Sequence, residues 1–142
     1  VEETMVRVTL LPGLLRTLQK NTRRELPQRI FEVGDVCRLD ADAETGAGER
    51  RHLAAALTAA SAGFADLRPV LEAVLAELGW DLSTEPLVSG AYLPGRSAQV
   101  IALRGDERRV VGTLGELHPE VLDRFRLRHP TVAFELELGP LL

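Results

Sequence analysis

Apolar residues recur every three or four positions near the start of the chain, which is the spacing of one face of an α-helix. The pattern predicts a helix over residues 10–22, with Thr9 as its N-cap and Pro27 preventing its continuation. The basic residues at its end complement the negative pole of the helix dipole. The apolar face consists of Leu10, Leu11, Leu14, Leu15 and Leu18.

A second helical pattern covers residues 64–78 and is the clearest in the chain. Asp66 is available to cap its start, and Gly79 is placed to end it. A third, short helix is predicted after His118, which serves as N-cap and is followed by Pro119 in the first turn. We therefore expect three helices.

Extended patterns occupy much of the remaining chain. Residues 29–39 predict a strand with a bulge at Gly34, because the apolar positions change parity there. A hairpin is expected with its tip at residues 104–107. Residues 131–138 alternate apolar and polar side chains, which indicates a strand with one face in water. The other extended segments are residues 82–88, 97–103 and 108–114.

Two segments are less regular. Residues 52–60 favour helix by their alanine content, yet they lack a stripe of larger apolar residues, so their local signal is ambiguous. Residues 40–49 are acidic, small and glycine-containing, which predicts an exposed connection.

The order of elements favours an α+β fold, in which helices lie on one face of a mainly antiparallel sheet.

Composition is that of one globular domain. The 142 residues are 45% hydrophobic and 27% charged, unlike a disordered tail. No apolar run reaches the roughly 18 residues of a membrane span, and the first residues lack the pattern of a secretory signal. Cys37 is the only cysteine, so no internal disulfide can form. We expect a cytoplasmic protein with a single domain, residues 1–142.

The overall charge argues against one class of partner. Seventeen basic and twenty-one acidic side chains give a net charge of −4. Because the field of an acidic molecule repels a phosphate backbone, nucleic-acid binding by this chain alone is disfavoured.

No group of residues points to catalysis. The three histidines and Cys37 lack the spacing of a zinc site. Glu116 and His118 could form an acid–base pair, although a strand end followed by a helix cap explains them better. Arg96 lies in a turn that could hold an anion, but an arginine resting on a neighbouring carboxylate is the commoner arrangement. We predict no catalytic, cofactor-binding or metal-binding residue.

Five blocks, in this order, resemble the catalytic-like module of the phenylalanyl-tRNA synthetase β chain. The likeness extends over nearly the whole chain, and the second block is more similar to the archaeal and eukaryotic form of the family. The blocks are VRVTLLPGLL (residues 6–15), ELPQRIFEVGD (25–35), PGRSA (94–98), GTLGELHPEVL (112–122) and FELE (134–137).

The resemblance implies a class II aminoacyl-tRNA synthetase-like fold, an antiparallel sheet flanked by helices, and it implies that residues 52–60 form a strand. In this family the α chain uses ATP and magnesium to attach phenylalanine to its tRNA, within a heterotetramer. The module itself would need no cofactor and would be inactive alone. Because full β chains are several times longer, we expect this chain to be an excised part of one.

The resemblance also implies a partner and an interface. The helix at residues 10–22 corresponds to the family's dimer-interface element, so Leu10, Leu11, Leu14, Leu15 and Leu18 would contact the α chain. An apolar stripe alone does not distinguish this from burial against the chain's own sheet. Transfer RNA would be reached only through the holoenzyme, no membrane is involved, and the isolated module could self-associate.

Two other functions stay open. The first is a stand-alone small enzyme or ligand-binding domain on the same fold, using the surroundings of Arg96, Glu116 and His118. The second is a small tRNA-binding module, against which the acidic charge balance argues.

Overall fold

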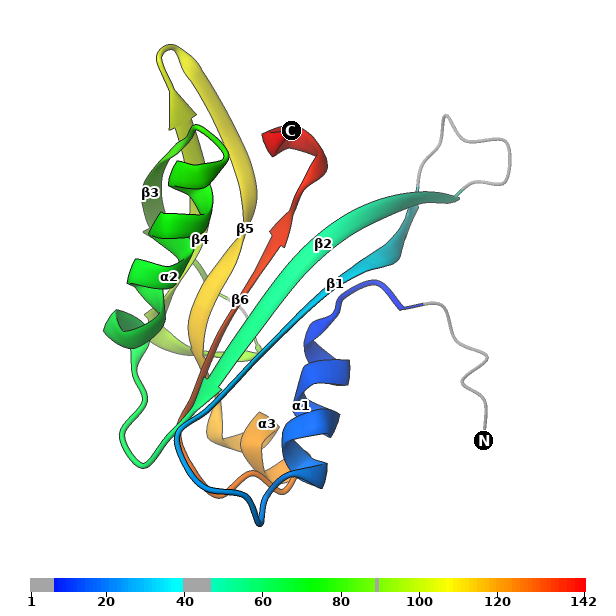
Figure 1. Ribbon diagram of the computed structural model, residues 1–142, viewed down its shortest axis with the longest axis vertical. Helices are drawn as coiled ribbons and strands as arrows, with labels where there is room; N and C mark the ends of the chain where they lie inside the picture. The colour runs from blue at the N-terminus through cyan, green and yellow to red at the C-terminus, as the bar shows by residue number, and fades with distance from the viewer. Residues whose placement is uncertain (1–6, 40–46, 89) are drawn as a thin grey trace.

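A six-stranded antiparallel sheet organises the chain, with helices on both of its faces (Figure 1). The computed structural model describes residues 7–39, 47–88 and 90–142. The strands are β1 (Gln28–Leu39), β2 (Ala47–Thr58), β3 (Asp81–Pro86), β4 (Tyr92–Arg104), β5 (Glu107–Leu117) and β6 (Thr131–Glu137), in the order β1-β2-β6-β5-β4-β3. The helices are α1 (Leu11–Lys20), α2 (Phe64–Glu77), α3 (Pro119–Arg124) and a short 3-10 turn, η1 (Gly139–Leu141). The predicted α+β class with an antiparallel sheet is confirmed.

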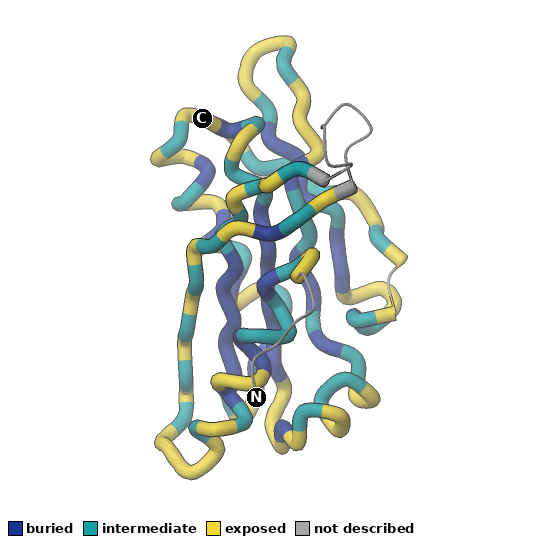
Figure 2. Tube along the Cα trace, turned by 90° about the vertical axis from the view of Figure 1, so that its right-hand side faces the viewer, coloured by how far each residue is buried: buried dark blue, intermediate teal, exposed yellow. Residues whose placement is uncertain are grey.

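The helices divide between two cores instead of sharing one face. Leucines of α2 pack with Ala55, Leu57 and Phe134 on one face of the sheet. Leucines of α1 and residues of α3 pack with Ala54 and Ala56 on the other. Alternate residues of β2 therefore enter opposite cores, and Figure 2 shows the buried segments running through the middle of the sheet. The prediction of helices on one face was wrong, because the order of elements on which it rested does not fix the face of the sheet against which each helix packs.

The alanine-rich segment at residues 52–60 is a strand over most of its length, as the resemblance implied. It belongs to β2, which pairs with β1 on one side and β6 on the other. Pairing along both edges outweighs the helical propensity of alanine. The small side chains of Ala54 and Ala56, exposed by 0% and 1%, let α1 approach the sheet closely.

The predicted bulge at Gly34 is absent, because β1 pairs with β2 residue for residue from Gln28 to Leu39. The change of parity has another cause. Phe31 and Val33 face the α2 side of this edge strand and are exposed, whereas Val36 faces the α1 side and is buried. The irregularities of the described sheet lie instead between β4 and β5, at the register shifts Tyr92/Ser97 and Val100/Ile101.

The helix caps follow the predictions only in part. His118 caps α3 as predicted, because its Nδ1 accepts the amide hydrogen of Glu120 at 3.1 Å. Gly79 follows the end of α2 with a φ of 88°, a conformation that glycine adopts without strain. The N-cap of α2 is Gly63 and not Asp66, whose carboxylate accepts the Gly63 amide hydrogen at 2.8 Å.

The predicted hairpin joins β4 to β5, with Gly105 in the left-handed conformation at its tip. Nearby, the Arg104 guanidinium lies 4.0 Å from the centre of the Trp80 ring, and the Trp80 indole donates to the carbonyl of Leu141 at 3.0 Å. These contacts fasten the hairpin base and the C-terminal turn together. The predicted connection at residues 40–49 lies largely outside the described residues. Within the described residues no helix is long and apolar enough to cross a membrane.

Candidate subunit interface

The structure places most of the predicted interface leucines inside this chain's own core. Leu10, Leu14, Leu15 and Leu18 are each exposed by 4% or less. They pack in one cluster with the alanines of β2 and with Ala133 of β6, whereas Leu11 is only partly buried against that cluster. Among these five leucines, Leu11 alone retains surface that a second protein could contact.

A buried carboxylate holds the start of α1. Glu135, in the middle of β6, accepts the amide hydrogens of Leu10 at 3.0 Å and Leu11 at 3.2 Å, and the Thr9 hydroxyl hydrogen. The predicted cap, Thr9, is thus a minor contact, and the N-cap position is Leu10. A negative charge at this end of a helix is favourable because the free amide groups and the helix dipole both face it.

The same carboxylate binds His52 of β2, whose Nδ1 lies 2.6 Å from Glu135 Oε2. The prediction that β6 has one face in water was wrong, because Thr131 to Leu136 are all buried. Glu135 occupies one of the alternating polar positions of this strand, and this pattern had indicated a side chain that faces solvent. Its role depends on tertiary structure, because Leu10, the N-cap of α1, lies 125 residues earlier in the chain.

Tyr92 and Thr113 extend this polar region beneath α1. The Tyr92 hydroxyl and Thr113 Oγ1 lie 3.2 Å apart. Burial raises the pKa of Tyr92 above its usual value, the hydrogen bond with Thr113 lowers it, and the charge of Glu135 raises it. Gly115 leaves space for the tyrosine, since a Cβ there would lie 2.7 Å from the ring.

The residues considered for catalysis are engaged in structural contacts. Arg96 lies in β4 and not in the predicted turn, but it pairs with Glu116 at 3.1 Å, the contact with a neighbouring carboxylate that the sequence favoured. The other oxygen of Glu116 accepts the amide hydrogen of Phe64 at the start of α2, at 3.1 Å. His118 uses its Nδ1 to cap α3. Glu116 and His118 therefore serve two different helices.

We also searched the described residues for groups of side chains that could bind a metal ion. Among them, no three histidine, cysteine or acidic side chains gather in a way that could bind an ion. Cys37 is half-buried on the edge strand β1, and its amide donates to the carbonyl of Arg7 at 2.9 Å.

An apolar groove lies between α2 and the strands β1 and β2. Its volume is about 350 Å³, and its walls include Phe31, Leu53, Val70 and Val74. Phe31 is 73% exposed and Val70 44% exposed, and the neighbouring Val33 is 49% exposed. We call this feature, with Val33 at its rim, the apolar groove. Such a patch on a globular domain is typical of a contact with another protein.

The groove exists because α2 does not extend over the whole sheet. The helix packs mainly on β3, β4, β5 and β6, and it leaves the edge strand β1 uncovered on this face, where Phe31 and Val33 are exposed (Figure 1). Sequence reasoning missed the groove, because Phe31 and Val33 carry the same apolar signal as core residues of a strand.

Comparison with known proteins gives a consistent result. The sequence profile described as the phenylalanyl tRNA synthetase beta chain CLM domain matches residues 1–138. The chain is 42% identical over 99% of its length to the phenylalanine–tRNA ligase beta subunit of Methanopyrus kandleri. It is similar to the beta subunits of Pyrococcus horikoshii, 37% identical over 96% of the chain, and Archaeoglobus fulgidus, 38% identical over 97%. The chain spans 23% to 24% of the length of these relatives.

Proposed function

Since the chain belongs to the phenylalanyl-tRNA synthetase beta chain CLM domain family, we propose that it is a non-catalytic, class II synthetase-like module of phenylalanine–tRNA ligase. In this proposal the module packs against a catalytic alpha chain in the cytoplasm. The alpha chain uses ATP and magnesium to attach phenylalanine to tRNA, and the module supports the assembly in which this happens.

The observation that carries the proposal is the apolar groove. Exposing an aromatic side chain such as Phe31 by 73% is unfavourable unless a partner covers it in the assembled protein. The groove continues from Phe31 across Leu53 to Val70, so one apolar segment could contact β1, β2 and α2 together. Aromatic residues near the centre of such patches contribute most to affinity.

In this proposal, α1 offers a partner a smaller contact surface than its leucine pattern suggested. Leu10, Leu14, Leu15 and Leu18 are covered by this chain's own strands, so a partner would contact Leu11 and the exposed side of the helix. The leucine face then supports the interface indirectly, by fixing α1 on the sheet.

The contacts of Arg96, Glu116 and His118 support a module without chemistry of its own. Each of these side chains makes a hydrogen bond or an ion pair with a neighbouring part of the fold. A general acid or base must instead reach a substrate proton from a site that is open to the substrate.

Co-expression with a cognate alpha chain, followed by size-exclusion chromatography, tests the proposal. The two chains should co-elute at micromolar concentration. The variant Phe31→Glu should weaken co-elution at least tenfold, because it places a charge in the apolar groove. The matched control is Val110→Glu, which introduces the same charge at a 47% exposed valine outside the groove. Separate elution of the unmodified chains would contradict the proposal.

A further inference from the structure

Positive charge is concentrated at one end of the molecule. The segments 20–25 and 123–128 carry six basic side chains and two carboxylates, Glu25 and Asp123, whereas the whole chain has a net charge of −4. All six basic residues are exposed. We call them the basic end: Lys20, Arg23, Arg24, Arg124, Arg126 and Arg128.

Most arginines outside the basic end are paired with a carboxylate. Eight arginines elsewhere lie 2.6 to 3.4 Å from a carboxylate: Arg7, Arg38, Arg50, Arg51, Arg96, Arg104, Arg108 and Arg109. Within the described part of the chain, none of the six residues of the basic end takes part in such a pair. Their guanidinium and ammonium groups are therefore available to an external anion.

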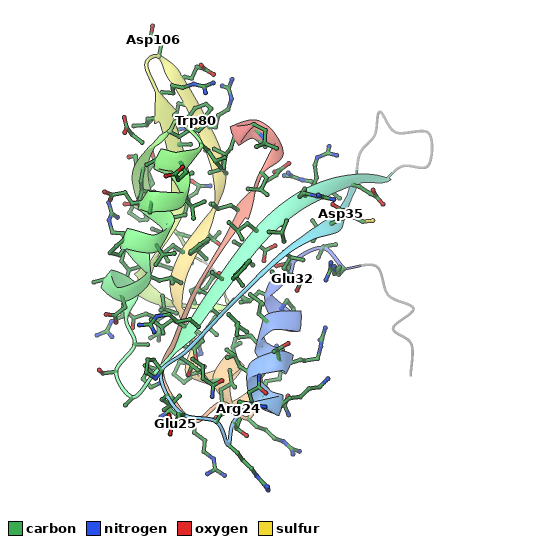
Figure 3. The ribbon with its side chains drawn as sticks, viewed as in Figure 1. Arg24, Glu25, Glu32, Asp35, Trp80 and Asp106 are labelled. Carbon is green, nitrogen blue, oxygen red and sulfur yellow. The ribbon has the colours of Figure 1, made fainter. Side chains whose placement is uncertain are left out.

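The fold brings the two basic segments together. Leu18 near the end of α1 and Leu127 just after α3 are buried in the same core cluster. Leu18, Thr22 and Arg128 line one shallow hollow, which places the two segments side by side. Figure 3 shows Arg24 at this end of the molecule and Asp106, at the hairpin tip, at the opposite end of the long axis.

The backbone beneath the charges is held by hydrogen bonds. The Gln28 amide group donates to the carbonyls of Asn21 at 2.9 Å and Arg24 at 3.2 Å. After α3, the Leu127 amide donates to the carbonyl of Leu122 at 2.8 Å. Arg126, in the same segment as Leu127, has a φ of 57°, where glycine is the usual residue. The basic end is thus a fixed surface and not a loose tail.

We propose that the basic end binds the phosphate backbone of RNA. The inference rests on the proposed function, because the relatives named above are ligases that act on tRNA. The net negative charge of the chain does not prevent this binding. At physiological salt, charges farther than about 8 Å from a phosphate are largely screened, so the local excess of positive charge determines the interaction. Arginine is well suited to this role, because its planar group donates two parallel hydrogen bonds to one phosphate.

An RNA backbone fits this surface better than an acidic protein does. Tight protein interfaces are anchored by large apolar side chains in their centre. The exposed large apolar residues of the described chain, such as Phe31 and Val70, all lie outside the segments 20–25 and 123–128. A surface of charges without an apolar anchor is typical of sequence-independent contacts to phosphates.

Fluorescence anisotropy with a labelled phenylalanine tRNA transcript, between about 50 and 300 mM KCl, tests the proposal. The unmodified chain should bind more tightly as salt is lowered. The double variant Arg24→Gln/Arg128→Gln should bind at least tenfold more weakly at the lowest salt, and its slope of log Kd against log salt should fall by about two. The matched control, Arg108→Gln/Arg109→Gln, removes the same charge from the opposite end and should change Kd less than threefold.

Equal losses in the two double variants, or RNA binding that does not depend on salt, would overturn the proposal. Co-elution with the alpha chain is measured on the same variants. If Arg24→Gln/Arg128→Gln loses co-elution while its RNA affinity is unchanged, the basic end is a protein contact and the RNA proposal is wrong. If the unmodified chain binds RNA as expected but does not co-elute, the assembly function fails and the RNA proposal stands.

Discussion

His52 Nδ1 lies 2.6 Å from Glu135 Oε2, and the same carboxylate accepts the first amide hydrogens of α1. One side chain of a central strand therefore connects a neighbouring strand to a helix that begins near the other end of the sequence. Both side chains are largely buried, with exposures of 16% and 11%. In such surroundings a hydrogen-bonded carboxylate stabilises the fold, because removing it leaves several donors unpaired.

We expect Glu135→Gln to lower the free energy of unfolding by about 1–3 kcal/mol. The amide keeps one acceptor, but it loses the charge that faces the helix amides and brings hydrogen donors toward them. Urea unfolding followed by circular dichroism measures the change. The control is Glu137→Gln, two residues along the same face of β6. Glu137 pairs with the more exposed Arg38 and Arg50, so the cost there should stay below about 1 kcal/mol. Equal costs would show that the contact with α1 is unimportant.

Gly112→Ala should lower the free energy of unfolding by roughly 3 kcal/mol or more, or prevent folding. A Cβ at this position would lie 2.0 Å from the carbonyl oxygen of Glu135, a backbone atom of the paired strand that cannot move without breaking the sheet. Gly139→Ala is the control, because a Cβ there has no atom within 4 Å. Soluble yield and thermal unfolding of the two variants distinguish the outcomes. A Gly112→Ala protein as stable as the control would contradict the β5–β6 register.

Alkaline pH should destabilise the protein through Tyr92. Burial, the first cause, raises its pKa above the usual 10.0. The unfolded chain therefore releases this proton first, and the free energy of unfolding falls as the pH rises above about 10 toward the folded pKa. Below pH 10 this contribution is fully present.

Tyr92 is the only tyrosine of the chain, so its ionisation can be followed by ultraviolet absorbance without interference from other tyrosines. In the native protein the tyrosinate signal should appear above pH 10 and coincide with loss of structure. Tyr92→Phe should unfold with a shallower alkaline dependence, after a loss near neutral pH of about 1 kcal/mol for the bond to Thr113. Titration of the native tyrosine at or below pH 10 would refute the assignment.

The isolated chain should self-associate through the apolar groove when no partner covers it. Static light scattering over a dilution series should show an average mass that rises with concentration. Phe31→Glu should abolish the rise, whereas Val110→Glu should preserve it, since Val110 lies outside the groove. A constant monomer mass for the unmodified chain would contradict this prediction.

Local sequence predicted those features that neighbouring residues decide. The helical spacing of leucines placed α1, and the hairpin tip followed from the turn residues around Gly105. The cap at His118 followed from the order of histidine, proline and a carboxylate, because a cap needs only groups two or three residues apart. Resemblance to a family, and not local propensity, identified β2 as a strand.

Tertiary structure decided which element covers each apolar or polar face. The leucine stripe of α1 has the same sequence pattern whether it meets Ala54 and Ala56 or another protein, and only the folded chain shows that it meets these alanines. Glu135 has the pattern of a solvent-facing residue, but its partner is a helix start 125 residues away. The charge balance of −4 likewise concealed a basic end. The physical reason is the same for the leucine stripe, Glu135 and the basic end. Periodicity defines which residues share a face of a helix or strand, and composition defines the total charge. The burial of a face and the charge of a local surface depend on residues that only folding brings together.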